Sequence, residues 1–118
     1  MKDESLEQIL NDPLLRDYCP SERRAILVHR YFLGLEIERS PGLAEAIDSW
    51  EQRVAKGWRR EKMRRDAEAQ LFEIEKHKYF LSKQAGCDVG WDVAAHDWIT
   101  QHAPAWRAWW EKLPESGA

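Results

Sequence analysis

The 118-residue sequence has little of what usually marks a chemical site, with two cysteines, six glycines and four histidines. Cys19 and Cys87 lie far apart and form no Cys-x-x-Cys pair, so neither a zinc-finger spacing nor a dithiol redox motif is present. The sequence also contains no glycine-rich phosphate loop and no Gly-x-Ser-x-Gly nucleophile motif. We therefore predict no cofactor, and an enzymatic activity has no motif in its favour.

Long apolar runs are also missing. No segment approaches the ~18 apolar residues that a membrane-spanning helix needs. The chain opens with Met1, Lys2 and Asp3, which is unlike a signal peptide. The formal net charge of −3 provides no overall attraction to nucleic acid or to an anionic membrane. We expect a cytoplasmic protein with reduced cysteines and no membrane partner.

Tryptophan is abundant, with seven residues in a chain whose charged (33%) and hydrophobic (43%) fractions are ordinary. Apolar residues recur at spacings of three and four, and no segment alternates as a strand does, so we predict an all-α fold. Helices are expected over 21–39, over 41–85 in one piece or in two that meet near 64–66, and over 91–113.

The ends of these helices are predicted from residues that favour helix termini. The expected N-terminal caps are Ser21, Ser40 and Asp88. Gly86 is expected to end a helix, and Pro104 to kink the last helix without stopping it. Residues 1–20 are expected to form a lead-in with short helical turns, in which Asp12 caps a turn, and residues 114–118 a tail.

A shift of 48 residues aligns the chain with itself without a gap. Residues 29–33 (His-Arg-Tyr-Phe-Leu) fall on 77–81 (His-Lys-Tyr-Phe-Leu). Further matching pairs are Ile26 and Ile74, Gly42 and Gly90, Ala46 and Ala94, Trp50 and Trp98, Ala55 and Ala103, and Trp58 and Trp106. So many matches indicate duplication of one helix–turn–helix unit.

This repeat predicts the architecture of the chain. One helical hairpin cannot cover its own apolar face, so we expect two tandem hairpins to form a four-helix assembly. The predicted single domain spans 21–113, with repeat 1 over about 22–65 and repeat 2 over about 66–113.

His29 and His77 are equivalent in this repeat, each three residues after an isoleucine on the core-facing stripe. Two interpretations stay open: hydrogen-bonded core histidines, or a metal or cofactor site that uses both imidazoles. A carboxylate-bridged di-metal bundle would need Glu three residues before each His, where this chain has only Ile or Val. Glu73 and Asp92 lie four residues before His77 and His96, a spacing that suits a ligand pair or a local hydrogen bond.

A basic segment runs from Arg53 to Arg65 with Trp58 inside it. A basic helix with an interleaved aromatic residue can bind phosphates and stack on bases, so a nucleic-acid-binding module is one alternative. Its candidate residues are Arg53, Lys56, Arg59, Arg60, Arg64 and Arg65. Because the charges surround the helix and the whole chain is acidic, a solvated helix is the competing interpretation.

Five of the seven tryptophans lie between residues 91 and 110. Trp109 and Trp110 depart from the repeat, because Glu61 and Lys62 stand at the equivalent positions. Tryptophan is enriched where proteins bind each other, so we predict a partner-binding surface here. Its residues are Trp106, Arg107, Trp109 and Trp110. Alternatively the two added tryptophans close the end of the bundle, and exposed tryptophans would also favour a homodimer.

Residues 77–82 (His-Lys-Tyr-Phe-Leu-Ser), followed by 85–90 (Ala-Gly-Cys-Asp-Val-Gly), resemble a segment of an uncharacterised bacterial domain family. In that family, found in proteins similar to lipopolysaccharide kinases, the segment reads His-Arg-Trp-Tyr-Leu-Ser-Glu and then Gly-x-Asp-Val-Gly. Lys83 stands where the family has Glu, and this chain has no kinase motifs. The resemblance implies a shared helix–turn–helix element and a bacterial origin, and it transfers no activity.

Together these patterns predict a small bacterial accessory or regulatory protein that acts by binding another protein. The alternatives are nucleic-acid binding by the basic segment and a metal or cofactor site at His29 and His77.

Overall fold

The computed structural model describes residues 2–113, which form α-helices and one 3-10 turn, with no strand among them. The all-α prediction is confirmed. The described residues divide into two compact units, one of residues 2–56 with 111–113 and one of residues 57–110. The domain and repeat boundaries expected from the sequence stay predictions. No helix within residues 2–113 combines the length and the apolar character that crossing a bilayer requires.

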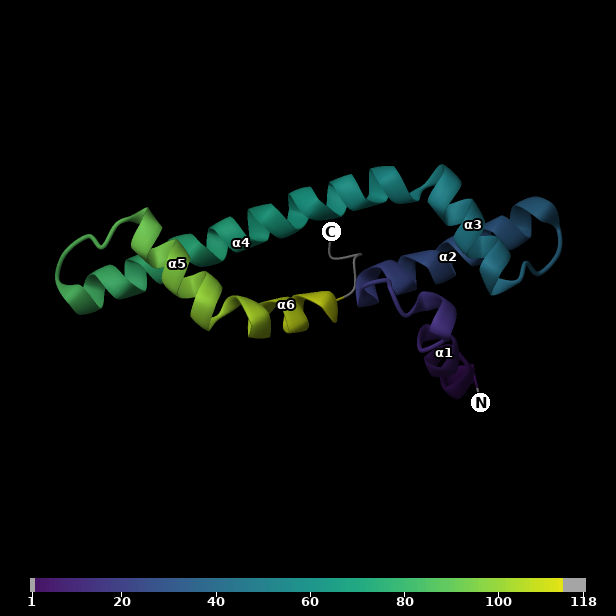
Figure 1. The fold of residues 1–118 in the computed structure, drawn as a ribbon, viewed down its shortest axis with the longest axis horizontal. Helices are drawn as coiled ribbons and strands as arrows, with labels where there is room; N and C mark the ends of the chain where they lie inside the picture. The colour runs from purple at the N-terminus through teal and green to yellow at the C-terminus, as the bar shows by residue number, and fades with distance from the viewer. Residues whose placement is uncertain (1, 114–118) are drawn as a thin grey trace. The chain divides into compact units, whose positions relative to one another are not determined.

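The first unit is built on a helical hairpin. Its elements are α1 (Lys2–Leu10), the turn η1 (Pro13–Leu15), α2 (Pro20–Ile37), α3 (Leu43–Arg53) and the start of α4 (Ala55–Ala85). α2 and α3 pack side by side, as Figure 1 shows. The apolar residues buried in this unit are Leu15, Ile26, Leu33, Ala46, Trp50 and Ala55.

Polar contacts hold the ends of this hairpin. The buried indole of Trp50 donates a 2.9 Å hydrogen bond from Nε1 to the carboxylate of Glu22, which is also buried. The guanidinium of Arg23 binds the carbonyl oxygens of Leu10, Arg16 and Tyr18, which ties the lead-in to α2. Asp12 caps η1 by accepting the N–H of Leu14 at 2.9 Å, as the sequence predicts.

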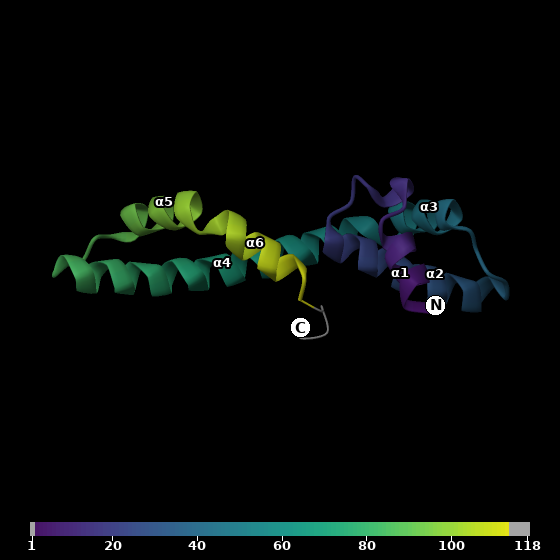
Figure 2. The ribbon, with the colours of Figure 1, turned by 90° about the horizontal axis from the view of Figure 1, so that it is seen from below.

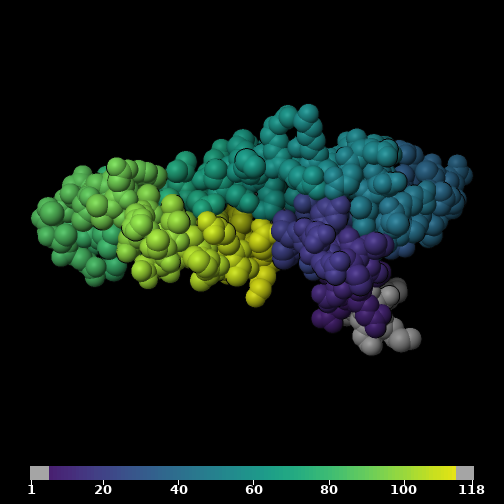
Figure 3. Space-filling model, in the orientation of Figure 1, coloured from purple at the N-terminus to yellow at the C-terminus, as the bar shows by residue number. Residues whose placement is uncertain are grey.

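The second unit places two short helices along a long one. From residue 57 onward it contains most of α4, then α5 (Trp91–Gln101) and α6 (Ala103–Glu111) up to residue 110. Figure 2 shows α5 and α6 following one another along α4, and the space-filling view in Figure 3 shows their atoms directly against it. The buried core of this unit consists of Ile74, Ala94, Trp98 and Ala103, with Leu81, Ala95 and Trp106 packed around it.

The structure corrects all three predicted N-terminal caps. α2 begins at Pro20 after the N-cap Cys19, and Ser21 instead directs its hydroxyl to Glu111 at 2.8 Å. The glycines Gly42 and Gly90 take the N-cap positions of α3 and α5 that were expected at Ser40 and Asp88. Asp88 accepts the N–H of Gly90 and so stabilises the turn before the helix.

The break between the second and third predicted helices lies at Val54, with φ −127°, and not near residues 64–66. α4 is continuous through that region because ion pairs one helical turn apart support it. Lys62 pairs with Asp66 at 2.5 Å, and Arg64 pairs with both Glu61 and Glu68.

The predicted stop at Gly86 is confirmed, since its φ of +73° ends α4 in a conformation that glycine adopts without strain. The last predicted helix is interrupted at His102, whereas a kink within one helix was expected. Pro104 becomes the second residue of α6. A proline inside one continuous helix would clash with the carbonyl four residues earlier, so the preceding helix ends at Gln101.

Replacing Ile26, which is fully buried, by alanine is expected to reduce the free energy of unfolding by about 2–5 kcal/mol. Urea denaturation followed by circular dichroism measures this loss. Val28→Ala on the same helix is the matched control, because Val28 is 56% exposed. Equal losses in both variants would contradict the assignment of Ile26 to the core.

Candidate functional site

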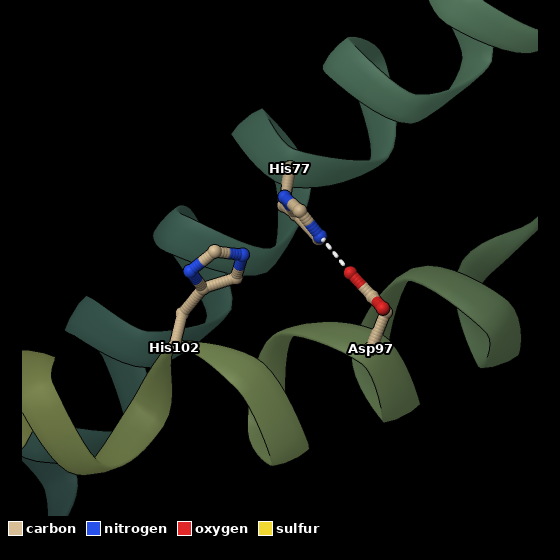
Figure 4. A group of neighbouring side chains, drawn as sticks. All are labelled: His77, Asp97 and His102. Carbon is tan, nitrogen blue, oxygen red and sulfur yellow. Dashed lines mark hydrogen bonds and ion pairs between the residues drawn. The ribbon is translucent and has the colours of Figure 1, made fainter.

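The second unit gathers three side chains that can act as metal ligands. His77 lies on α4, Asp97 lies on α5, and His102 is the single residue between α5 and α6. Figure 4 shows His77 and Asp97 pointing toward one another, with the ring of His102 beside that of His77. The break at His102 contributes to this arrangement, since it redirects the backbone at the residue that carries the second imidazole.

The three groups are close enough to bind one ion. One nitrogen or oxygen atom from each residue lies within 4.8 Å of the others. His77 Nε2 and Asp97 Oδ2 are hydrogen-bonded at 2.6 Å, and the ring centroids of His77 and His102 are 4.8 Å apart. The side chain of His77 is 11% exposed, while that of Asp97 is 40% exposed. His77 is therefore the least exposed of the three candidate ligands, and Asp97 and His102 lie nearer the surface.

A groove of about 370 Å³ opens beside these residues. His77 and His102 line it together with the aromatic rings of Phe80, Trp98 and Trp106. The indole N–H of Trp106 is buried and has no acceptor among the described residues. Buried donors are normally paired, so this one indicates room for an acceptor that the described residues do not provide.

His29, the other histidine of the predicted metal pair, lies in the first unit. Its Nε2 is 2.9 Å from the hydroxyl of Ser49, and its ring forms a T-shaped pair with that of Trp50 at a centroid distance of 5.8 Å. Burial lowers the pKa of His29, and the charge of Arg53 lowers it further. Within the units, His29 and His77 thus have different partners, and a site shared by the two stays a prediction.

Of these three residues, only His77 was predicted from the sequence as a candidate metal ligand, and Asp97 and His102 were not. A signal was available in the 48-residue register, in which Asp97 aligns with Ser49 and His102 with Val54. The structure pairs the histidine of each unit with the residue twenty positions later, Ser49 in one and Asp97 in the other. A comparison of the two halves for gained ionisable groups would have selected both residues.

The tryptophans proposed as a partner surface differ in their surroundings. Trp106 and Trp110 stack with centroids 5.1 Å apart, and Trp110 Nε1 donates to Asp66 at 2.7 Å. Trp109 is 54% exposed, and Arg107 is exposed as well. Of the residues predicted to contact a partner, Trp109 and Arg107 are therefore the accessible ones, while Trp106 and Trp110 pack against neighbouring side chains.

Acidic side chains meet several charges of the basic segment. Arg53 binds Glu36 through two hydrogen bonds of 3.0 and 3.1 Å. Arg64 binds both Glu61 and Glu68. These pairs reduce the positive charge available to phosphates. Nucleic-acid binding by this segment stays a prediction.

A second groove, of about 450 Å³, lies in the first unit between α1, α2 and the loop that follows α2. Apolar side chains from the helices line it, among them Leu6, Leu27 and Leu35. Arg30 and Arg39 line it too; Arg30 Nε donates to the carbonyl of Pro41, and Arg39 pairs with Glu45.

Comparison with family models, with curated proteins and with solved structures found no match for this chain.

We predict that Trp110→Ala lowers the free energy of unfolding by about 3 kcal/mol or more, because it removes a ring stacked on Trp106 and a bond to Asp66. Trp109→Ala is the control and is expected to cost less than about 1 kcal/mol, since that ring is 54% exposed. Thermal and urea denaturation compare the two. A larger loss in Trp109→Ala would contradict these assignments.

Acidification is expected to destabilise the folded chain in part through His29. Its folded pKa lies below the ordinary 6.5, so the unfolded chain binds more protons as the pH falls through that value. The stability contribution is present at neutral pH and is lost below about pH 6.5. The variant His29→Gln should show a shallower fall in unfolding free energy between pH 7 and pH 5. Parallel pH profiles for the two proteins would refute this role of His29.

Proposed function

We propose that this chain is a small accessory or regulatory protein that acts by binding another protein. The observation that carries the proposal is the exposure of large apolar side chains in both units. Tyr31 and Phe32 are 64% and 59% exposed, and Tyr79 and Phe80 are 65% and 53% exposed. Apolar surface of this kind is a frequent feature of protein-binding faces.

The groove of the first unit is the proposed docking site, and its occupant is an amphipathic helix of the partner protein. Tyr31 and Leu35, both more than half exposed, line the groove one helical turn apart, which suits helix-against-helix packing. Both charged residues in its lining, Arg30 and Arg39, are basic. Glu45 already binds Arg39 through two hydrogen bonds, whereas Arg30 uses Nε for a backbone carbonyl and can offer its terminal nitrogens to a carboxylate. The partner helix is therefore expected to carry apolar residues flanked by acidic ones.

Trp109 and Arg107 remain a second proposed contact, in the unit that contains α5. Tryptophan combines a large apolar area with a polar N–H, and arginine can form two parallel hydrogen bonds to one carboxylate. Both residues are therefore frequent contributors to binding energy. In this proposal Trp106 and Trp110 support the α6 backbone and do not themselves meet the partner.

We also infer that the chain arose by duplication of one helical hairpin. α3 and α5 support this inference, since each has 11 residues and each follows an N-cap glycine. The residues after the two helices, Val54 and His102, have similar φ values of −127° and −122°. α2 and α4 also end alike, at residues with positive φ, Glu38 and Gly86.

Burial follows the same register, which supports the duplication further. The residue pairs that are buried in both halves are Ile26 and Ile74, Ala46 and Ala94, Trp50 and Trp98, and Ala55 and Ala103. Members of each pair are 48 residues apart. The four-helix assembly of the two hairpins stays a prediction.

The proposed function is tested by comparing what groove variants bind. The variants Leu35→Glu and Arg30→Glu place negative charge in the groove, and Val28→Glu places the same charge at an exposed site on α2 that does not line it. We expect the wild type and Val28→Glu to capture the same protein from native extract, at a fixed ratio of captured protein to this chain. Neither groove variant should capture that protein. With the partner purified, each groove variant should weaken the Kd at least about tenfold. A peptide copied from the acidic-apolar helix of the partner should compete.

Two results would overturn the proposal. Capture of the same proteins by all the variants would show that the groove is not the docking site. A dimer seen by light scattering that Leu35→Glu dissociates would identify the occupant as a second copy of this chain.

A further inference from the structure

Four ionisable residues, three in the lining of the second-unit groove and one beside it, have no ionisable counterpart in the first half of the sequence. Glu73, Lys76, Asp97 and His102 stand 48 residues after Ala25, Val28, Ser49 and Val54. The rest of the site is the same in both halves, namely a histidine, a phenylalanine and two tryptophans. The second half therefore carries a carboxylate and an additional imidazole beside a histidine that both halves possess.

The ligand atoms of His77, Asp97 and His102 suit a transition metal. Imidazole nitrogen combined with a carboxylate oxygen is typical of zinc and neighbouring divalent ions, whereas calcium and magnesium prefer oxygen ligands alone. Metal bonds of about 2.1 Å in a tetrahedron would separate ligand atoms by about 3.4 Å. The three atoms lie within 4.8 Å of one another, so movement of about an ångström would bring them to that spacing.

The surroundings allow this movement. His77 is nearly buried and keeps its position, while Asp97 is 40% exposed and His102 is exposed, so both can rotate toward it. Binding of a metal ion would replace the hydrogen bond between His77 Nε2 and Asp97 Oδ2. Neutral imidazole carries one proton, so Nε2 of His77 is free to bind the ion in the tautomer whose proton is on Nδ1.

We propose that His77, Asp97 and His102 bind one divalent transition-metal ion, for which Zn²⁺ is the natural probe. Three protein ligands leave a fourth position for a water molecule or a carboxylate oxygen. Such an oxygen is the kind of acceptor that the buried N–H of Trp106, in the lining of the same groove, does not find within the described chain. Glu73, which also lines the groove and pairs with Lys76 at 3.2 Å, is a further carboxylate at its edge.

Binding of the ion would join α4 to the junction of α5 and α6, because the ligands come from all three places. An ion that binds only the folded unit stabilises it in proportion to the logarithm of its concentration over Kd. Metal binding should therefore raise the melting temperature. This proposal is independent of the docking groove, since its ligands belong to the other unit.

The test is calorimetric titration of the full chain, freed of any affinity tag, with Zn²⁺. The variants Asp97→Ser and His102→Val introduce the residues that the first half carries at the equivalent positions, where a helical hairpin accommodates them. His96→Ala is the matched histidine control, because His96 lies exposed on α5 outside the cluster. Cys87→Ser controls for zinc binding by the exposed thiol.

We expect one ion per wild-type chain, with affinity at least about tenfold weaker in Asp97→Ser and in His102→Val and unchanged in His96→Ala and Cys87→Ser. Co²⁺ or Cu²⁺ should quench tryptophan fluorescence in the wild type, since Trp98 and Trp106 line the same groove, and not in His102→Val. Circular dichroism confirms that each variant keeps its helices, and His102→Gln replaces any that does not.

Three results would overturn the metal site. These are failure of the wild type to bind Zn²⁺ or Co²⁺ at millimolar concentration, binding that His102→Val and Asp97→Ser leave intact, and binding that disappears in Cys87→Ser.

Discussion

Each unit depends on one buried tryptophan packed on a helical hairpin. Trp50 and Trp98 are 2% and 4% exposed, and each lies four residues after a fully buried alanine. An indole contributes a large part of the apolar area that a small unit can bury, and an alanine one turn away lets the neighbouring helix approach closely. Because these cores are small, the surrounding helices keep large apolar side chains on the surface.

Two features bear on whether the partner is a nucleic acid or a protein, namely the paired charges of the basic segment and the exposed apolar residues of the first-unit groove. Acidic neighbours form ion pairs with Arg53, Lys62 and Arg64. These pairs favour a solvent-exposed helix over a phosphate-binding one. Tyr31 and Leu35, by contrast, remain exposed beside a groove in which both charged lining residues are arginines. The proposal of a protein partner with apolar and acidic residues rests on these two features.

The two halves differ in the side chains that surround their equivalent histidines. The first half binds its histidine to a serine hydroxyl, and the second binds it to a carboxylate with another imidazole beside it. The aromatic environment is retained in both, with Trp50 and Trp98 at equivalent positions. If the two halves arose by the proposed duplication, the presence of Asp97 where the first half has Ser49 would be a single substitution that adds a candidate metal ligand to the second half.

Helical structure, the stop at Gly86 and the cap at Asp12 were predictable because they depend on interactions within a few residues along the chain. The core positions of Ile26 and Ile74 followed from helical spacing for the same reason. The break at Val54 and the N-caps at Gly42 and Gly90 were not predictable, since packing across the hairpin and the neighbouring turn decide where each helix begins. The grouping of His77 with Asp97 and His102 likewise depends on how α5 lies along α4. Asp97 and His102 are 20 and 25 positions after His77, so they meet it only when two helices lie side by side. Spacing along one helix predicts contacts three or four residues apart and cannot predict this one.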